Sequence, residues 1–579
     1  MNRAAIDFET TRERIEAFNR NLIESVVGPL GVDAGLGLAE ILKSLAAGLA
    51  QDRERWLEIQ NRYYRKQLEL WASHVLARKK APRQPVVEPA PSDRRFRAAE
   101  WRSEPYFEYL VQSHLLAAQW LKDIVAHAKL EAHAKRKLEF FSRQFIDAMS
   151  PANFPWSNPE ALKLAAETGG ESVARGLKNL AADFEKGMIS MTDESAFEIG
   201  RNLAVTPGAV IYQNDFMQLI QYRPATDTVF ERPLVMVPPC INKYYVLDLQ
   251  PENSFVRYAV ERGHTVFMVS WRNMPREMGR ATWDEYLEHG VLQALSVAAE
   301  VCGVERVNAL GFCVGGTLLG AALAVIRAKG ADPVASLTLL ATMLDFSDTG
   351  ELGIFVDEPF VRKREQEFAQ GGVLHGRELA LTFASLRAND LIWYYVVNNY
   401  LKGRTPEPFD LLHWNGDSTN LPGAMYVYYL RNLYLENNLR VPGKLSMCGV
   451  PVDLGRIDMP AYVLATREDH IVPWKTAYAS TQVLKGKIEF VLAASGHIAG
   501  VVNPASKNRR SYWLKPVLEA DPEQWLARAT SHEGSWWTHW STWLAPFGAN
   551  RVASRATLGG GRYAEIEPAP GRYVKEKCG

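Results

Sequence analysis

The residue with the clearest chemical signature is Cys313, in the stretch Gly311-Phe312-Cys313-Val314-Gly315. An apolar run that ends at Leu310 predicts a buried strand before it, and the small and apolar residues from Gly316 onward predict a helix after it. The flanking glycines allow a strained turn that lifts one side chain above the edge of a sheet. At a helix N-terminus, unpaired N–H groups also favour an anion. The context predicts a cysteine nucleophile; for the pentapeptide alone, a packing turn of small residues is the alternative.

A nucleophile needs a base and a group that orients the base, and two later segments supply both. Asp469 follows the apolar run 461–465, and His497 follows the apolar run 488–493. In α/β-hydrolases the order along the chain is nucleophile, acid, histidine, which is the order found here. Taken singly, Asp469 is equally well a turn residue and His497 a loop histidine. Their joint order and context predict a Cys-His-Asp triad.

The oxyanion formed in acyl transfer needs backbone donors close to the nucleophile. The N–H of Val314 follows the cysteine directly, and a second donor is expected from the loop after Val237, at Ile241. We also expect His470, which adjoins the proposed acid, and Asn242 to contact the substrate.

The elements that position these residues alternate along the second part of the chain. Apolar runs predict an antiparallel pair of strands and then six strands separated by helical stretches (210–212, 217–222, 234–237, 265–269, 307–310, 337–341, 461–465 and 488–493). Such alternation predicts a mostly parallel sheet with helices on both faces, which is the α/β-hydrolase fold. The interval between Ala341 and Ala461 is far longer than a simple crossover needs. It is rich in aromatic residues, and we expect it to form a cap over the nucleophile.

The first part of the chain lacks strand-like alternation. Apolar residues three or four apart predict helices at 13–27, 38–49, 53–77 and 107–128, with a proline-rich loop at 81–92. The sequence therefore predicts two domains. A helical domain is expected over 1–200, and an α/β-hydrolase-like catalytic domain over 201–579, with the cap inserted at about 345–455.

Composition limits the classes of function. The 579 residues are 47% hydrophobic and 23% charged, which is typical of a globular protein of more than one domain. Equal numbers of basic and acidic residues, 66 of each, do not favour nucleic acid as a partner. The apolar run 318–326 is far shorter than the ~20 residues of a membrane span, and the N-terminus does not resemble a signal peptide. Five scattered cysteines favour free thiols in a reducing cytoplasm, and neither a metal site nor a bound cofactor is expected.

Several sequence blocks resemble those of class I polyhydroxyalkanoate synthases. With the elbow around Cys313, the blocks at 238–249 (P-P-C-I-N-K-Y-Y-V-L-D-L), 270–273 (S-W-R-N), 467–474 and 534–537 extend the resemblance from about 93 to 544. Val314-Gly315 after the cysteine is similar to the short-chain class. Met274 departs from the pattern, because many relatives have proline there.

The resemblance implies an enzyme that joins (R)-3-hydroxyacyl-CoA, chiefly 3-hydroxybutyryl-CoA, into a polyester and releases CoA through a thioester on Cys313. A thiolate attacks a thioester well, and thiol-for-thiol exchange is nearly balanced, which agrees with acyl transfer. The resemblance also implies a cytoplasmic homodimer at the surface of polyester granules, in contact with the growing chain and with granule-associated proteins. The N-terminal region would help in dimer formation and granule attachment.

Several alternatives stay open at the level of sequence. Asp469 either orients His497 or helps to activate the 3-hydroxyl group of the incoming unit. An acyl-CoA thioesterase or ester hydrolase would use the same triad and pass the acyl group to water. A non-catalytic granule-associated protein would keep the N-terminal helices and would need no triad.

Overall fold

The computed structural model describes residues 41, 43–45, 48, 52–75 and 84–578. The chain divides into two compact units, one formed by 1–193 with 381–407 and the other by 194–380 with 408–579. The helix expected at 13–27, and most of the one expected at 38–49, lie outside the described residues.

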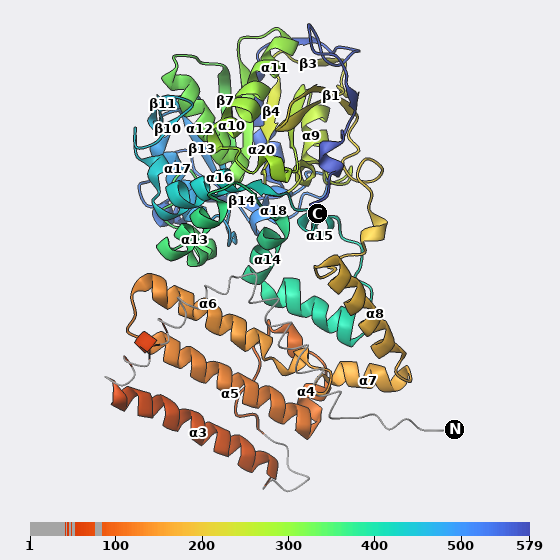
Figure 1. The fold of residues 1–579 in the computed structure, drawn as a ribbon, viewed down its shortest axis with the longest axis vertical. Coiled ribbons are helices and arrows are strands. Elements are labelled where there is room, and N and C mark those ends of the chain that lie inside the picture. Colours follow the sequence, from red (N-terminus) through yellow and green to blue (C-terminus); the bar gives the residue numbers. More distant parts are fainter. Residues whose placement is uncertain (1–40, 42, 46–47, 49–51, 76–83, 579) are drawn as a thin grey trace. The chain divides into compact units, whose positions relative to one another are not determined.

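The N-terminal unit is helical, as the sequence predicts. Its main helices are α3 (Arg53–Val75), α4 (Glu100–Ser103), α5 (Pro105–His127), α6 (Ala132–Ala148), α7 (Pro159–Glu167) and α8 (Glu171–Lys186). Helices α3, α5 and α6 lie side by side (Figure 1). The indole N–H of Trp120 on α5 donates to the side-chain Oε1 of Gln60 on α3 at 2.7 Å, and Arg62 pairs with Asp123 at 2.7 Å. These polar contacts fix how α3 packs along α5.

Residues 381–407 belong to this N-terminal unit, although they lie inside the long insertion. They form two π-helical turns, η8 (Asn389–Trp393) and η9 (Val396–Leu401), and η9 packs on α8. The Tyr400 hydroxyl donates to the Asp183 carboxylate at 2.7 Å, and the Asn179 amide donates to the Asn399 carbonyl at 3.0 Å. A single boundary near residue 200 does not account for this segment, because its partners are distant in sequence.

The second unit is built on one large sheet with strand order β15-β14-β13-β12-β7-β6-β4-β5-β2-β1-β17. Its strands are β1 (Gly208–Gln213), β2 (Met217–Tyr222), β4 (Leu234–Val237), β5 (Val266–Trp271), β6 (Val307–Phe312), β7 (Val334–Leu340), β12 (Ala461–Thr466), β13 (Ile488–Ala493), β14 (Ser511–Leu514), β15 (Thr530–Glu533) and β17 (Glu567–Pro568). Strands β5, β4, β6, β7, β12 and β13 run parallel, and antiparallel strands extend both edges. The predicted α/β-hydrolase fold is confirmed.

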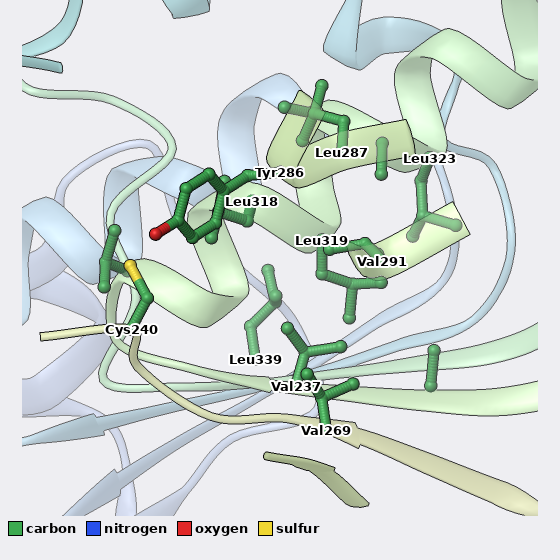
Figure 2. Close-up of a cluster of buried hydrophobic side chains, with 14 of the residues drawn as sticks. Val237, Cys240, Val269, Tyr286, Leu287, Val291, Leu318, Leu319, Leu323 and Leu339 are labelled. Atoms are coloured by element: carbon green, nitrogen blue, oxygen red, sulfur yellow. The ribbon is translucent and has the colours of Figure 1, made fainter. Parts of the chain in front are cut away.

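Helices cover both faces of the sheet. On one side lie π-helix η6 (Tyr286–Leu292), α11 (Gln293–Cys302), α12 (Val314–Ala328) and α17 (Trp474–Val483), and on the other lie α9 (Phe255–Glu261) and α20 (Trp536–Leu544). Alternate residues of each strand enter opposite cores. In β4, for example, Val235 and Val237 enter one core, and Leu234 and Met236 enter the other. Figure 2 shows Val237, Val269 and Leu339 of the sheet facing leucines of α12 and η6.

The rest of the insertion belongs to the second unit and is also mostly helical. It contains α13 (Glu358–Phe368), α14 (Gly376–Leu386, whose last residues fall in the N-terminal unit), α15 (Asp410–Asn415), α16 (Gly423–Tyr428) and the π-helix η10 (Tyr429–Leu435). Within the described part of the chain, no helix has the length and apolar character that crossing a bilayer requires.

Candidate active site

Cys313 lies between the end of β6 and the start of α12, in a backbone conformation that few non-glycine residues adopt. Its φ is 53° and its ψ is −129°, and it is the N-cap residue of α12. Its amide donates to the Leu340 carbonyl at 2.9 Å, and its own carbonyl accepts from the Gly316 amide at 2.9 Å. A strained residue held by hydrogen bonds on both sides is the geometry of a nucleophile elbow.

The glycines around Cys313 are required by close packing. A Cβ at Gly311 would overlap with the backbone of Gly316, and a Cβ at Gly315 would overlap with the carbonyl oxygens of Val237 and Pro238. The turn therefore presses against the loop that follows β4. This contact brings together the two segments from which oxyanion donors are expected.

Asp469 lies just after β12 with a side chain that is 0% exposed. Its Oδ1 accepts from the amides of Ile471 and Val472, at 2.9 and 2.8 Å, and its Oδ2 accepts from the Thr466 hydroxyl at 3.0 Å. The same Oδ2 lies 2.7 Å from Nδ1 of His497. The carboxylate is held by four groups, so its position toward the imidazole is fixed.

His497 begins the short helix α18 (His497–Val501) after β13, and its side chain is 5% exposed. Its ring stacks on the Phe312 ring, with centroids 5.5 Å apart. Burial alone would lower the pKa of His497, but the Asp469 carboxylate and the neighbouring Cys313 more than offset burial and raise this pKa to about 10. Since Nδ1 faces Asp469, the other ring nitrogen is left for the thiol. The structure thus brings Cys313, His497 and Asp469 into one chain of contacts.

The expected oxyanion donors lie on either side of the elbow contact. Val314 is the first residue of α12, so its N–H has no partner within the helix. Ile241 lies in the loop after β4, and its carbonyl accepts from the Thr419 amide at 2.8 Å. The start of that loop is fixed by the Trp271 indole, which donates to the Pro238 carbonyl at 2.9 Å.

The two expected substrate contacts occupy different settings. Asn242 forms a β-bridge with Ser418, and its side-chain amide donates to the Asn415 carbonyl at 3.5 Å. His470 is half-buried next to Asp469, and its carbonyl lies close to Gly350. The Asn242 side chain thus faces the insertion segment around Asn415.

Several residues near the site were not predicted from the sequence. Tyr429 and Tyr434, from the insertion, lie close enough to Cys313 to interact with it electrostatically, and burial raises the pKa of both. Cys240 packs beside Tyr286 in the core (Figure 2), and burial raises the pKa of its thiol to about 12. Aromatic residues are common in this insertion, so sequence alone did not single out these two tyrosines.

Comparison with known proteins shows the family to which the chain belongs. Residues 92–259 match the model of the poly-beta-hydroxybutyrate polymerase (PhaC) N-terminus, and residues 233–504 match the alpha/beta hydrolase fold. A poly(3-hydroxyalkanoate) polymerase subunit PhaC of Cupriavidus necator is 53% identical, over 90% of this chain and 88% of the relative. A poly(3-hydroxyalkanoate) polymerase of Methylorubrum extorquens is 40% identical over 100% and 99% of the two chains, and one of Rhizobium meliloti is 40% identical over 93% and 89%. The chain therefore belongs to the poly(3-hydroxyalkanoate) polymerase family of acyltransferases.

Proposed function

We propose that this chain polymerises short (R)-3-hydroxyacyl-CoA units, chiefly 3-hydroxybutyryl-CoA, through a covalent thioester on Cys313. The observation that carries the proposal is the 2.7 Å contact between His497 and the buried Asp469, next to a cysteine at a strained strand-to-helix turn. This is the arrangement by which a base and its orienting group activate a nucleophile.

In the acylation step, His497 takes the proton of the Cys313 thiol, and the sulfur attacks the carbonyl carbon of the acyl-CoA. The carbon–sulfur bond to coenzyme A then breaks, and His497 returns the proton to the leaving thiolate, so free CoA departs. The Val314 and Ile241 N–H groups would stabilise the oxyanion that forms between these events. The contact of the elbow with the carbonyls of Val237 and Pro238 supports this pairing of donors.

In the elongation step, the 3-hydroxyl of an incoming hydroxyacyl-CoA attacks the thioester on Cys313. His497 takes the hydroxyl proton and gives it to the departing Cys313 sulfur, while the new ester bond forms. The extended chain, now on coenzyme A, can acylate Cys313 again. The four contacts of the Asp469 carboxylate support an orienting role for Asp469, with His497 as the base in both steps.

The proposal extends to setting and partners. The enzyme works as a homodimer in the cytoplasm, at the surface of the polyester granules that it makes, where granule-associated proteins are further partners. His470 and Asn242 are proposed substrate contacts. For Asn242 the contact requires that its bonds to the 415–418 segment rearrange when substrate enters.

The fate of the acyl group tests the proposal. Purified enzyme is incubated with labelled (R)-3-hydroxybutyryl-CoA, and the product is separated into soluble acid and insoluble polyester. We expect polyester, with one CoA released for each unit joined. Stoichiometric release of free 3-hydroxybutyrate would instead identify a thioesterase that uses the same triad.

A further inference from the structure

Lys243 is a buried cation for which the catalytic steps provide no role. It is the last residue of the loop that carries Ile241, and it is 2% exposed. Its ammonium group donates to two main-chain carbonyls of a distant segment, Glu576 at 2.7 Å and Tyr573 at 3.5 Å. Burial lowers the pKa of Lys243, against the charges of Asp417 and Glu576. Burying an ammonium group costs free energy, which these hydrogen bonds and nearby charges must offset.

The segment that Lys243 contacts is anchored independently at several points. Strand β17 pairs with β1, and after it the Gln218 side chain accepts from the amides of Arg572 and Tyr573, both at 3.1 Å. The Tyr573 hydroxyl donates to the Asn214 carbonyl at 2.8 Å. Residues 572–577, which we call the strap, are therefore anchored at Arg572 and Tyr573 and pack against β5.

The strap also reaches the insertion segment that pairs with the Ile241 loop. The side-chain Nδ2 of Asn273 donates to the backbone carbonyl of Lys577 at 2.9 Å. The side-chain Oδ1 of Asn273 accepts from the backbone amide of Asn420, also at 2.9 Å. One side chain thus joins the strap to the segment whose Thr419 amide bonds the Ile241 carbonyl. The ion pair of Lys577 with Asp417, at 3.0 Å, adds little, because the Lys577 side chain is 63% exposed.

We propose that residues 572–577 hold the loop bearing the Ile241 N–H in place, with Lys243 and Asn273 as positioning residues for oxyanion stabilisation. The start of the loop is fixed by the core, through Trp271. Its end is held on the backbone side by the Trp414 indole, which donates to the Lys243 carbonyl at 2.7 Å, and on the side-chain side by the strap, through the Lys243 ammonium group. Lys243 lies in the middle of the sequence block at 238–249 and Asn273 ends the S-W-R-N block, so residues of both blocks contact the strap. The inference rests on the proposed function, because it assigns Ile241 to the oxyanion site.

The test separates the oxyanion site from the nucleophile. The substitution Lys243→Met keeps the length of the side chain and removes both hydrogen bonds to the strap. Single-turnover acylation of Cys313 by 3-hydroxybutyryl-CoA is measured beside alkylation of Cys313 by iodoacetamide, which needs the thiol but no oxyanion donor. A displaced donor should slow acylation by ~10- to 100-fold. Alkylation and the substrate KM should stay at their wild-type values.

Lys575→Met is the matched control, because Lys575 lies in the same strap, is exposed, and has its ammonium group near Gly200. It should behave as wild type in both reactions. Wild-type acylation in Lys243→Met would overturn the inference. A parallel loss of acylation and alkylation would also overturn it, since that pattern means a general disordering of the site. If the wild type carried no acyl group on Cys313, the proposed function would be wrong. That outcome is distinct from a failure of the inference on the strap.

Asn273→Asp tests the same inference without removing a buried cation. It keeps the acceptor for the Asn420 amide and replaces the donor to the Lys577 carbonyl. We expect this variant to acylate more slowly than the wild type and to be alkylated at the wild-type rate. Wild-type rates in both reactions would contradict the inference. This variant decides the question if Lys243→Met does not fold.

Discussion

Replacing Asp469 by Asn removes one negative charge from the most buried part of the site and leaves its shape nearly unchanged. The amide can still occupy the space between His497 and the Ile471 and Val472 amides. What it cannot do is stabilise a positively charged imidazole. The variant therefore isolates the electrostatic contribution of Asp469 from its contribution to packing.

The size of the effect follows from the pKa of His497. Burial lowers that pKa, whereas charged neighbours raise it, and the Asp469 carboxylate has the largest raising effect. The net result is a rise from 6.5 to about 10. One pKa unit is worth about 1.4 kcal/mol, so the imidazolium is favoured by roughly 5 kcal/mol relative to water. Without the carboxylate, the pKa of His497 should fall well below 10. We expect acylation to slow by ~10²- to 10⁴-fold, as in other triads that lose their acid.

Stability gives a second readout with a defined sign. Because the folded-state pKa of His497 is raised, the protonated imidazole contributes to the free energy of unfolding. This contribution is fully present below pH 6.5 and is lost as pH rises through about 10. The free energy of unfolding of the wild type should therefore exceed that of Asp469→Asn most at pH 6.5 and below. The difference should shrink toward pH 10.

The assay combines rapid-quench acylation with an NMR titration of histidine-labelled protein. Glu468→Gln is the matched control, because it removes an exposed carboxylate one residue away. It should leave both the acylation rate and the pKa of His497 unchanged. If Asp469→Asn acylates at the wild-type rate and its histidine still titrates near 10, the reasoning is refuted.

Three further predictions concern the elbow, the base and the insertion. Gly315→Ala should destabilise the protein by ~1–3 kcal/mol in thermal unfolding, because its Cβ would overlap with the Val237 and Pro238 carbonyls; an equally stable variant would contradict this. His497→Gln should suppress both acylation and elongation in single-turnover assays, and loss of elongation alone would show that another group activates Cys313. Hydrogen exchange across 355–439 should change when a non-hydrolysable acyl-CoA analogue is added while β6 stays protected, and exchange as slow as that of the sheet in every condition would exclude a mobile cap.

The central parallel strands of the sheet could be predicted from sequence because they are buried on both faces. Strands β4 and β13 have the predicted bounds, and β6 and β12 extend slightly further. Continuous apolar runs of this kind are typical of parallel strands. The antiparallel pair β1 and β2 was predicted, but β14 and β15 at the other edge were missed. Every residue of β15 is exposed, so that strand carries no apolar pattern.

The candidate site was predictable for the residues that follow strands, because chain order and local context mark them. Long-range partners could not be predicted in this way. The bond of Lys243 to the Glu576 carbonyl joins a side chain to a backbone atom, and a backbone atom leaves no signature in residue type. Likewise, no pattern in the amino-acid sequence of 381–407 indicates that this segment packs on α8.

The central claim is that Cys313 carries the acyl group. Labelled (R)-3-hydroxybutyryl-CoA is mixed with enzyme, quenched within one turnover and digested under conditions that preserve thioesters, and the labelled peptide is identified by mass spectrometry. The label should lie on the peptide that contains Cys313, and Cys313→Ala should carry none and release no CoA. Label on a peptide containing Cys240, Cys302, Cys448 or Cys578, or polymer formed at the wild-type rate by Cys313→Ala, would contradict the account.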